Sequence, residues 1–114
     1  MYIIIKHEFN MINFNDEHLI NVLNKIEFND EYPKTHAGFI MFLAKNKINL
    51  HIIPIYDVIG KRYIWDAIDN SEEYPFSFAE DYNSYDSFED ALDIAIVESI
   101  CYLSIKNNSV GVDF

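Results

Sequence analysis

Carboxylate groups are concentrated in one part of this chain. Between residues 63 and 105 there are eleven Asp and Glu and no Lys or Arg, in a protein whose formal net charge is -11. The densest group surrounds the start of the clearest predicted helix and is interspersed with tyrosines. The candidate partner-binding residues are Asp81, Asp86, Glu89, Asp90, Asp93, Tyr82 and Tyr85. Carboxylates in this number can ligate a divalent cation, or they can bind the lysines and arginines of another protein.

The same carboxylates also have a purely structural explanation. Ser87 is a suitable N-cap for a helix. The carboxylates of Glu89, Asp90 and Asp93 would then stand in its first turns, where unpaired backbone N–H groups favour negative charge. A solvated, acidic helix start accounts for the pattern without any ligand. If the carboxylates do bind a partner, we expect them to imitate a track of phosphates in a basic groove of another protein.

Other chemistries are not indicated by the motifs. No His-x-x-x-His, Cys-x-x-Cys or calcium-loop spacing occurs, so we predict no metal site. No Gly-x-Ser-x-Gly motif, phosphate-binding loop or dinucleotide fingerprint occurs either, and the chain has only three glycines. Pairs of carboxylates can be drawn almost anywhere in so acidic a chain, so their spacing carries no information. We therefore expect no cofactor, no catalytic residue and no enzymatic activity.

The charge and the cysteine content restrict the partners and the location. A net charge of -11 repels nucleic-acid phosphates and anionic membranes, and it attracts basic protein surfaces. Cys101 is the only cysteine and falls in an apolar helical pattern, which is typical of a buried structural thiol in a reducing compartment. The apolar run at residues 2–5 is too short for a membrane span or a signal peptide. We predict a cytoplasmic protein that binds neither nucleic acid nor membranes directly.

The spacing of the apolar residues predicts the elements that position these side chains. A chain of 114 residues forms a single domain, 1–114. Helical spacing predicts helices over 16–28, 34–46 and 87–106, and alternation predicts strands over 2–9, 48–57 and 61–68. Tyr74, Phe76 and Phe78 alternate and indicate a further short strand. The expected fold is α+β: a small antiparallel sheet of three to four strands, with about three helices packed on one face.

The same spacing predicts which side of each helix is buried. In the last helix the predicted core residues are Leu92, Ala95, Ile96, Ile100 and Leu103, and Lys106 with the two asparagines after it ends the helix. In the helix over 34–46 the predicted buried side is Ala37, Ile40, Met41 and Ala44, widened by Phe39, Phe42 and Leu43. Pro33 is placed in the first turn of that helix. Pro54 predicts an edge position or a bulge for its strand.

A dense aromatic stretch precedes the last helix, and two interpretations of it stay open. It comprises Tyr63, Trp65, Tyr74, Phe76, Phe78, Tyr82 and Tyr85. In the first interpretation the inward half is core and the rest covers the hairpin. In the second the stretch is an interface, because aromatic residues rimmed by charge are enriched at binding hot spots. Stacking on nucleic-acid bases is not indicated, since the flanking residues are acidic rather than basic.

Three segments of the chain carry a resemblance. They are Phe42-Leu-Ala-Lys-Asn-Lys-Ile-Asn-Leu-His-Ile52, Lys61-Arg-Tyr-Ile-Trp65 and Tyr85-Asp-Ser-Phe-Glu-Asp-Ala-Leu92. Over residues 37–105 the chain resembles small uncharacterised proteins of phages and Bacteroidetes. Those have a helix ending in a lysine-rich turn, a strand, a tyrosine-rich strand and a closing Ser-Tyr-Glu-Glu-Ala-Leu helix. This chain has Phe42 where they tend to have tryptophan, and residues 1–35 have no counterpart. The resemblance implies an α+β fold and a phage or mobile-element setting, and it brings no catalytic residues.

Two functional hypotheses follow. The first is a non-enzymatic, acidic inhibitor of phage or mobile-element origin that engages the basic, nucleic-acid-binding surface of a host protein such as a CRISPR effector. An anti-CRISPR or other anti-defence protein is its most specific form. The second is a homodimeric accessory or structural protein with no link to nucleic acids. An acidic patch on one face would favour the first hypothesis, and an apolar patch across a twofold axis would favour the second.

Overall fold

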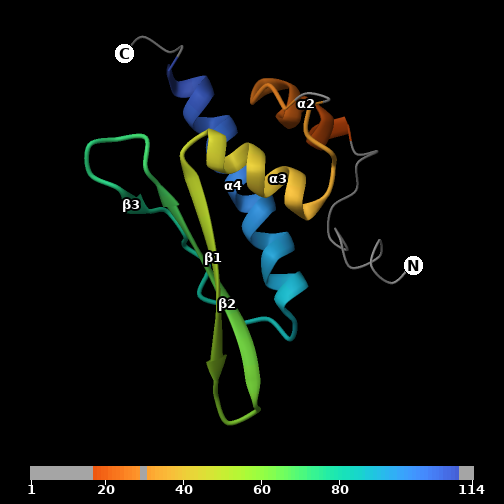
Figure 1. The fold of residues 1–114 in the computed structure, drawn as a ribbon, viewed down its shortest axis with the longest axis vertical. Helices are drawn as coiled ribbons and strands as arrows, with labels where there is room; N and C mark the ends of the chain where they lie inside the picture. The colour runs from red at the N-terminus through yellow and green to blue at the C-terminus, as the bar shows by residue number, and fades with distance from the viewer. Residues whose placement is uncertain (1–16, 29–30, 111–114) are drawn as a thin grey trace.

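The computed structural model of the protein describes residues 17–28 and 31–110 (Figure 1). The predicted strand over 2–9 lies outside the described residues. Along the chain the elements are α2 (Glu17–Lys25), α3 (His36–Lys45), β1 (Ile48–Tyr56), β2 (Lys61–Asp69), β3 (Phe76–Ser77) and α4 (Phe88–Val110). The described strands form one antiparallel sheet in the order β1-β2-β3. The predicted α+β fold with a small antiparallel sheet is confirmed.

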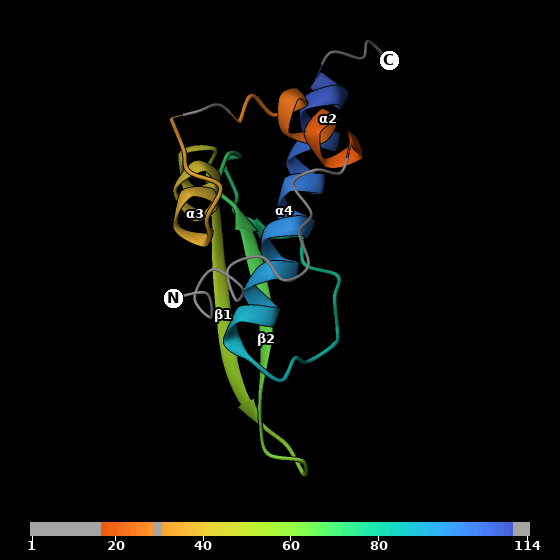
Figure 2. The same cartoon turned by 90° about the vertical axis from the view of Figure 1, so that its right-hand side faces the viewer.

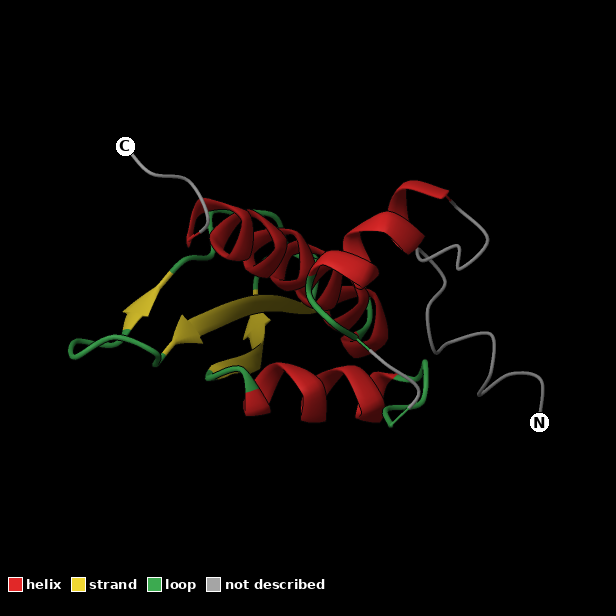
Figure 3. Ribbon diagram, turned by 90° about the horizontal axis from the view of Figure 1, so that it is seen from above, coloured by secondary structure: helices red, strands yellow, loops and turns green. Residues whose placement is uncertain are grey.

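Helix α4 covers one face of the hairpin made by β1 and β2. The strand residues Ile48, Trp65 and Ala67 alternate onto this face and are buried, whereas Asn49 and His51 on the other face are exposed. The five core residues predicted for α4 are all buried: Leu92, Ala95, Ile96, Ile100 and Leu103. Helix α2 packs against α4 on the side away from the sheet (Figure 3). The predicted core of the last helix is therefore confirmed.

The hairpin projects beyond the helices at its far end (Figure 1, Figure 2). Asp57 and Gly60 exchange both backbone hydrogen bonds, at 3.0 and 3.2 Å, and so enclose a loop of two residues. Because bonded and non-bonded pairs alternate along an antiparallel ladder, Pro54 opposite Tyr63 falls at a position whose backbone points away from β2. Its missing N–H removes no hydrogen bond from the ladder. The edge position predicted from Pro54 is confirmed, since β1 is an edge of the described sheet.

Helix α3 buries a different side from the one predicted. The buried residues are Gly38, Phe39, Phe42 and Leu43, whereas Ala37 and Ala44 are exposed. The side chains of Ile40 and Met41 are 39% and 60% exposed. This helix is apolar on almost every side, so the spacing of its residues did not distinguish the two faces. The phenylalanines occupy the core because their rings bury more surface than the smaller side chains do.

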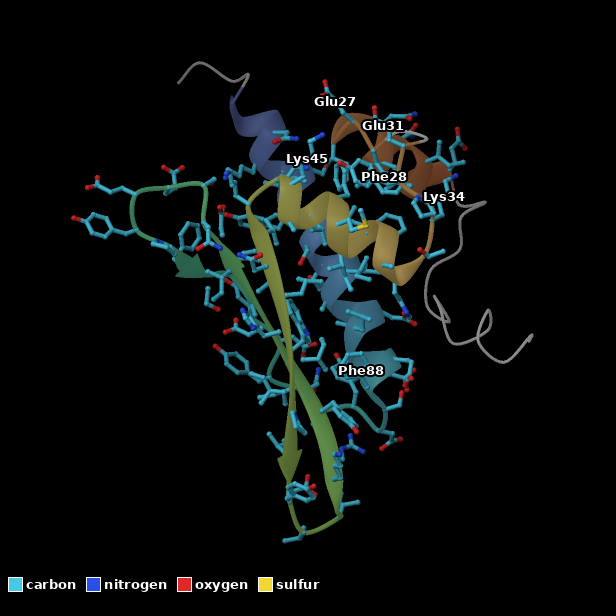
Figure 4. All side chains as sticks on the ribbon, viewed as in Figure 1. Glu27, Phe28, Glu31, Lys34, Lys45 and Phe88 are labelled. Atoms are coloured by element: carbon cyan, nitrogen blue, oxygen red, sulfur yellow. The ribbon has the colours of Figure 1, made fainter. Side chains whose placement is uncertain are left out.

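Aromatic rings join α3 to α2. The ring of Phe28 stacks on Phe39, with centroids 4.4 Å apart, and meets the edge of Phe42 at 5.1 Å. Figure 4 shows Phe28 at the junction of the two helices. These contacts connect α2 to the same core that α3 and α4 share.

The ends of the helices follow their capping residues. The Thr35 hydroxyl accepts a hydrogen bond from the Gly38 backbone N–H at 3.1 Å, so α3 begins at His36, and Pro33 precedes the helix instead of lying in its first turn. Ser87 caps α4 as predicted, accepting from the Asp90 N–H at 3.1 Å. The predicted end of α4 at Lys106 is wrong, because the helix continues to Val110. Asparagine lowers helix propensity only slightly and does not by itself end a helix.

Gly38 allows α3 to lie close against the segment that precedes it. A Cβ atom at this position would collide with the carbonyl oxygen of Pro33, which belongs to the backbone and cannot turn aside. We expect Gly38→Ala to destabilise the protein by about 1–3 kcal/mol through this overpacking. The loss should appear in urea denaturation even though alanine is the better helix former by about 1 kcal/mol. A Gly38→Ala protein more stable than the wild type would contradict the close approach.

Candidate protein-binding groove

The predicted carboxylates do not form one surface, and Asp93 is the clearest exception. Asp93 is completely buried, and His36 Nε2 at the start of α3 lies 2.5 Å from its Oδ1 atom. Its Oδ2 atom has no hydrogen-bond partner among the described residues. Asp93 was predicted to contact a partner at the surface, and that prediction is wrong because its side chain is buried. Asp93 lies three residues before Ile96 on α4, and helical spacing therefore turns it towards the core.

Asp81 is half-buried and holds the loop between β3 and α4 against β2. Trp65 Nε1 donates to its Oδ2 atom at 2.9 Å, and the Tyr85 hydroxyl donates to the same oxygen. The Asn83 backbone N–H donates to Oδ1 at 2.9 Å. Burial alone would raise the pKa of Asp81, but these hydrogen bonds outweigh it and hold the pKa below its usual value. The carboxylate of Asp81 therefore anchors the loop and is not free for a partner.

Tyr85 fixes the other end of the same loop. Its backbone N–H and C=O form hydrogen bonds with the C=O and N–H of Tyr63 at 2.8 and 2.9 Å. Burial, and then the hydrogen bond to the carboxylate of Asp81, raise the pKa of Tyr85 to about 12. The hydroxyl therefore stays protonated and continues to donate at physiological pH.

The remaining predicted residues lie on the surface near the start of α4. Asp86 is exposed and forms an ion pair with Arg62, the only arginine of the chain. The same guanidinium donates to the Ser84 hydroxyl at 3.0 Å and to the Ser84 carbonyl at 2.8 Å, so it is held in place. The first turn of α4 carries Glu89 and Asp90, both half-buried, and Tyr82 is 95% exposed. A role of these residues in binding stays a prediction.

A groove of about 810 Å³ lies between this loop and α4. Its apolar lining consists of Trp65, Phe76, Phe78, Ile94, Tyr102 and Ile105. Its carboxylates belong to Glu80, Asp81 and Glu98, and no Lys or Arg among residues 17–28 and 31–110 lines it. The rings of Phe78 and Tyr102 stack with centroids 3.8 Å apart and so connect the loop to the helix. Of the seven predicted residues, the groove brings together only Asp81 and Tyr85.

The electrostatic character of the groove comes from two exposed acids. Glu80 and Glu98 form no ion pair with any described residue. Burial, and then the charge of Glu98, raise the pKa of the Cys101 thiol, which also lines the groove and stays protonated at neutral pH. Glu98 was not among the predicted site residues. The available signal was that Glu98 is the single charged residue of the helical segment 94–105.

A polar network around Asp69, at the end of β2, was also not predicted. The buried carboxylate accepts hydrogen bonds from Ser71 N–H at 2.8 Å and Ser71 hydroxyl at 2.6 Å, from the Tyr102 hydroxyl at 2.5 Å and from Lys106 Nζ at 3.0 Å. Burial alone would raise the pKa of Asp69, but these donors hold it well below its usual value. The network ties the sheet to α4 and fixes Tyr102, one wall of the groove.

Within residues 17–28 and 31–110, no three His, Cys, Asp or Glu side chains converge closely enough to hold a metal ion. None of the helices in the same ranges combines the length and the apolar character that crossing a membrane requires.

Comparison of the chain with protein-family models, with curated proteins and with solved structures found no match.

Proposed function

We propose that this protein is a non-enzymatic, acidic binding protein that holds a basic segment of a partner protein in the groove between the β3–α4 loop and α4. The observation that carries this proposal is the composition of the groove. Apolar and aromatic walls are combined with the exposed carboxylates of Glu80 and Glu98, and none of the described Lys or Arg residues lines it. A lysine or arginine side chain has the matching chemistry, since its aliphatic stem packs on apolar surface while its charged end meets carboxylates.

The surroundings of the groove support the same partner. The loop before β3 carries the 78% exposed ring of Tyr74. The chain as a whole carries a net charge of -11, which would draw it towards a basic surface over distances of about a Debye length, roughly 8–10 Å in physiological salt. Aromatic side chains rimmed by charge are typical of binding hot spots.

In its most specific form, the partner is a nucleic-acid enzyme of a host cell, such as a CRISPR effector. The protein would then be an inhibitor of phage or mobile-element origin acting in the cytoplasm. Its carboxylates would occupy positions that the partner uses for phosphates. Direct binding of nucleic acid by this chain is not part of the proposal, because like charges repel.

The groove offers its own optical probe. Trp65 is the only tryptophan and lies in the lining, so its fluorescence should change when a nona-arginine peptide binds. We expect binding that weakens with added salt. We expect Glu80→Lys/Glu98→Lys to weaken it at least tenfold, because two like charges would then face the peptide. A nona-glutamate peptide should leave the fluorescence unchanged.

The matched control is Glu72→Lys/Glu73→Lys, which changes the net charge by the same amount at exposed positions that do not line the groove. This variant should retain most of the affinity. Equal losses in both variants would mean that bulk charge, not the groove, attracts the peptide. The same pair of variants should then be compared in displacement of DNA from a purified CRISPR effector. Full displacement by the groove variant would overturn the proposed inhibitory site.

A further inference from the structure

The hairpin ends in two apolar residues that its turn does not require. Val58 and Ile59 form the two-residue loop, and neither has a positive φ. Two-residue hairpin loops usually adopt turns in which at least one central residue has a positive φ. That residue is usually Asn or Gly. Here the Asp57 carboxylate holds the loop instead, accepting from the N–H groups of Ile59 at 2.8 Å and Gly60 at 3.1 Å. Gly60, at φ 134°, takes the unusual backbone conformation.

These apolar side chains are also among the most exposed of the described residues. Val58 is fully exposed, Ile59 is 79% exposed and the neighbouring Tyr56 is 78% exposed. We call these three residues the tip. They stand at the end of an arm that reaches beyond the helices (Figure 2). An exposed apolar cluster that the local fold does not need marks a contact with another molecule.

The charge near the tip indicates the kind of surface that it meets. Three charged residues flank the tip: Asp57, Lys61 and Arg62. The Asp57 carboxylate binds the backbone of its own loop and Arg62 is paired with Asp86, which leaves Lys61 to face another molecule. Lys61 is exposed, with its Nζ 5.5 Å from the ring centroid of Tyr63. The complementary surface is therefore an apolar hollow bordered by carboxylates and free of cations. The groove described above has this composition.

We propose that the tip binds in the groove of a second copy of this chain, and that the two copies exchange tips about a twofold axis. The tip cannot reach the groove of its own chain. Trp65 lies six positions after Ile59, within β2, which begins two residues after Ile59. At about 3.4 Å per residue the two are roughly 20 Å apart. In the antiparallel dimer the axis therefore passes the hairpin about halfway, near Arg62, and each copy buries one tip and fills one groove.

The dimer proposal rests on the exposed tip and the groove, and does not depend on the proposed basic partner. It does occupy the same surface, so tip exchange and partner binding compete. The tip of a second copy would then cover the groove until a partner with more positive charge displaces it. The tip variants and the groove variants separate the two ideas, because only the latter change the surface that a basic peptide meets.

The single native cysteine permits a direct test. Cys101 lines the groove, so Val58→Cys and, separately, Ile59→Cys should form an intermolecular disulfide with it under mild oxidation at alkaline pH. Such a bond requires Cα atoms within about 7 Å, which an unpaired chain cannot provide. Peptide mapping of the covalent dimer should find the introduced thiol joined to Cys101. The control is Met41→Cys, at a 60% exposed apolar position on α3, which should not cross-link to Cys101.

Sedimentation equilibrium of the unmodified protein gives an independent measurement. The wild type should dimerise. Val58→Asp/Ile59→Asp should raise the dissociation constant at least a hundredfold, whereas Met41→Asp should leave it unchanged. The tip variant should bind the nona-arginine peptide at least as well as the wild type. A wild type that stays monomeric at all concentrations, or cross-links that join only like cysteines, would overturn the proposal.

Discussion

Asp69→Ala is expected to destabilise the protein by about 3–5 kcal/mol, because it removes a buried carboxylate that accepts four hydrogen bonds, from Ser71, Tyr102 and Lys106. Lys106 Nζ and the Tyr102 hydroxyl both donate to this carboxylate. Urea denaturation with an unchanged slope would measure the difference. Glu72→Ala is the matched control, an exposed acid three residues away that should change stability by less than about 0.5 kcal/mol.

The pH dependence gives a second measurement of the same network. The pKa of Asp69 is lower in the folded protein than its usual value, so its contribution to stability is fully present above the unfolded pKa, about 3.9. The contribution is lost as the pH falls below that value. The wild type should therefore lose stability below about pH 4, and Asp69→Asn should lose less of it over the same range. If the two proteins lost the same stability below about pH 4, Asp69 would not be ionised in a stabilising network.

Leu92→Ala is expected to destabilise the protein by about 2–5 kcal/mol, because a methyl group would replace a side chain buried between α4 and its neighbours and would leave a cavity. Denaturant unfolding again provides the value. Met41→Ala, at a 60% exposed position on α3, should stay within about 0.5 kcal/mol of the wild type. A loss below about 1 kcal/mol for Leu92→Ala would mean that α4 packs loosely at this position.

The elements that could be predicted are those whose apolar residues recur with one clear period. The hairpin and α4 were predicted because their patterns are unambiguous, and Ile96 and Ile100 are buried as their spacing requires. Helix α3 is apolar all round, so its buried side depended on the long-range packing of Phe39 against Phe28, which no local pattern contains. The end of α4 was missed because Asn107 and Asn108 were taken to end the helix, although asparagine lowers helix propensity only slightly.

The site was predicted less completely than the fold, for a related reason. Acids adjacent in sequence were expected to act together, but a helix turns neighbouring residues to different sides. Asp93 thus enters the core, whereas Glu98 faces the groove. The groove itself forms where the loop before α4 passes the later turns of that helix. Only the folded chain brings those two segments together.

Pro54 also has a consequence for the behaviour of the protein at high concentration. The outer edge of β1 is a row of strand-forming isoleucines, the kind of segment on which further strands can add without limit until fibrils form. Pro54, at an outward-facing position, interrupts that row, because an incoming strand would find no N–H there and would meet the proline ring. Any assembly of this protein is thereby directed away from open-ended stacking and towards contacts that close on themselves.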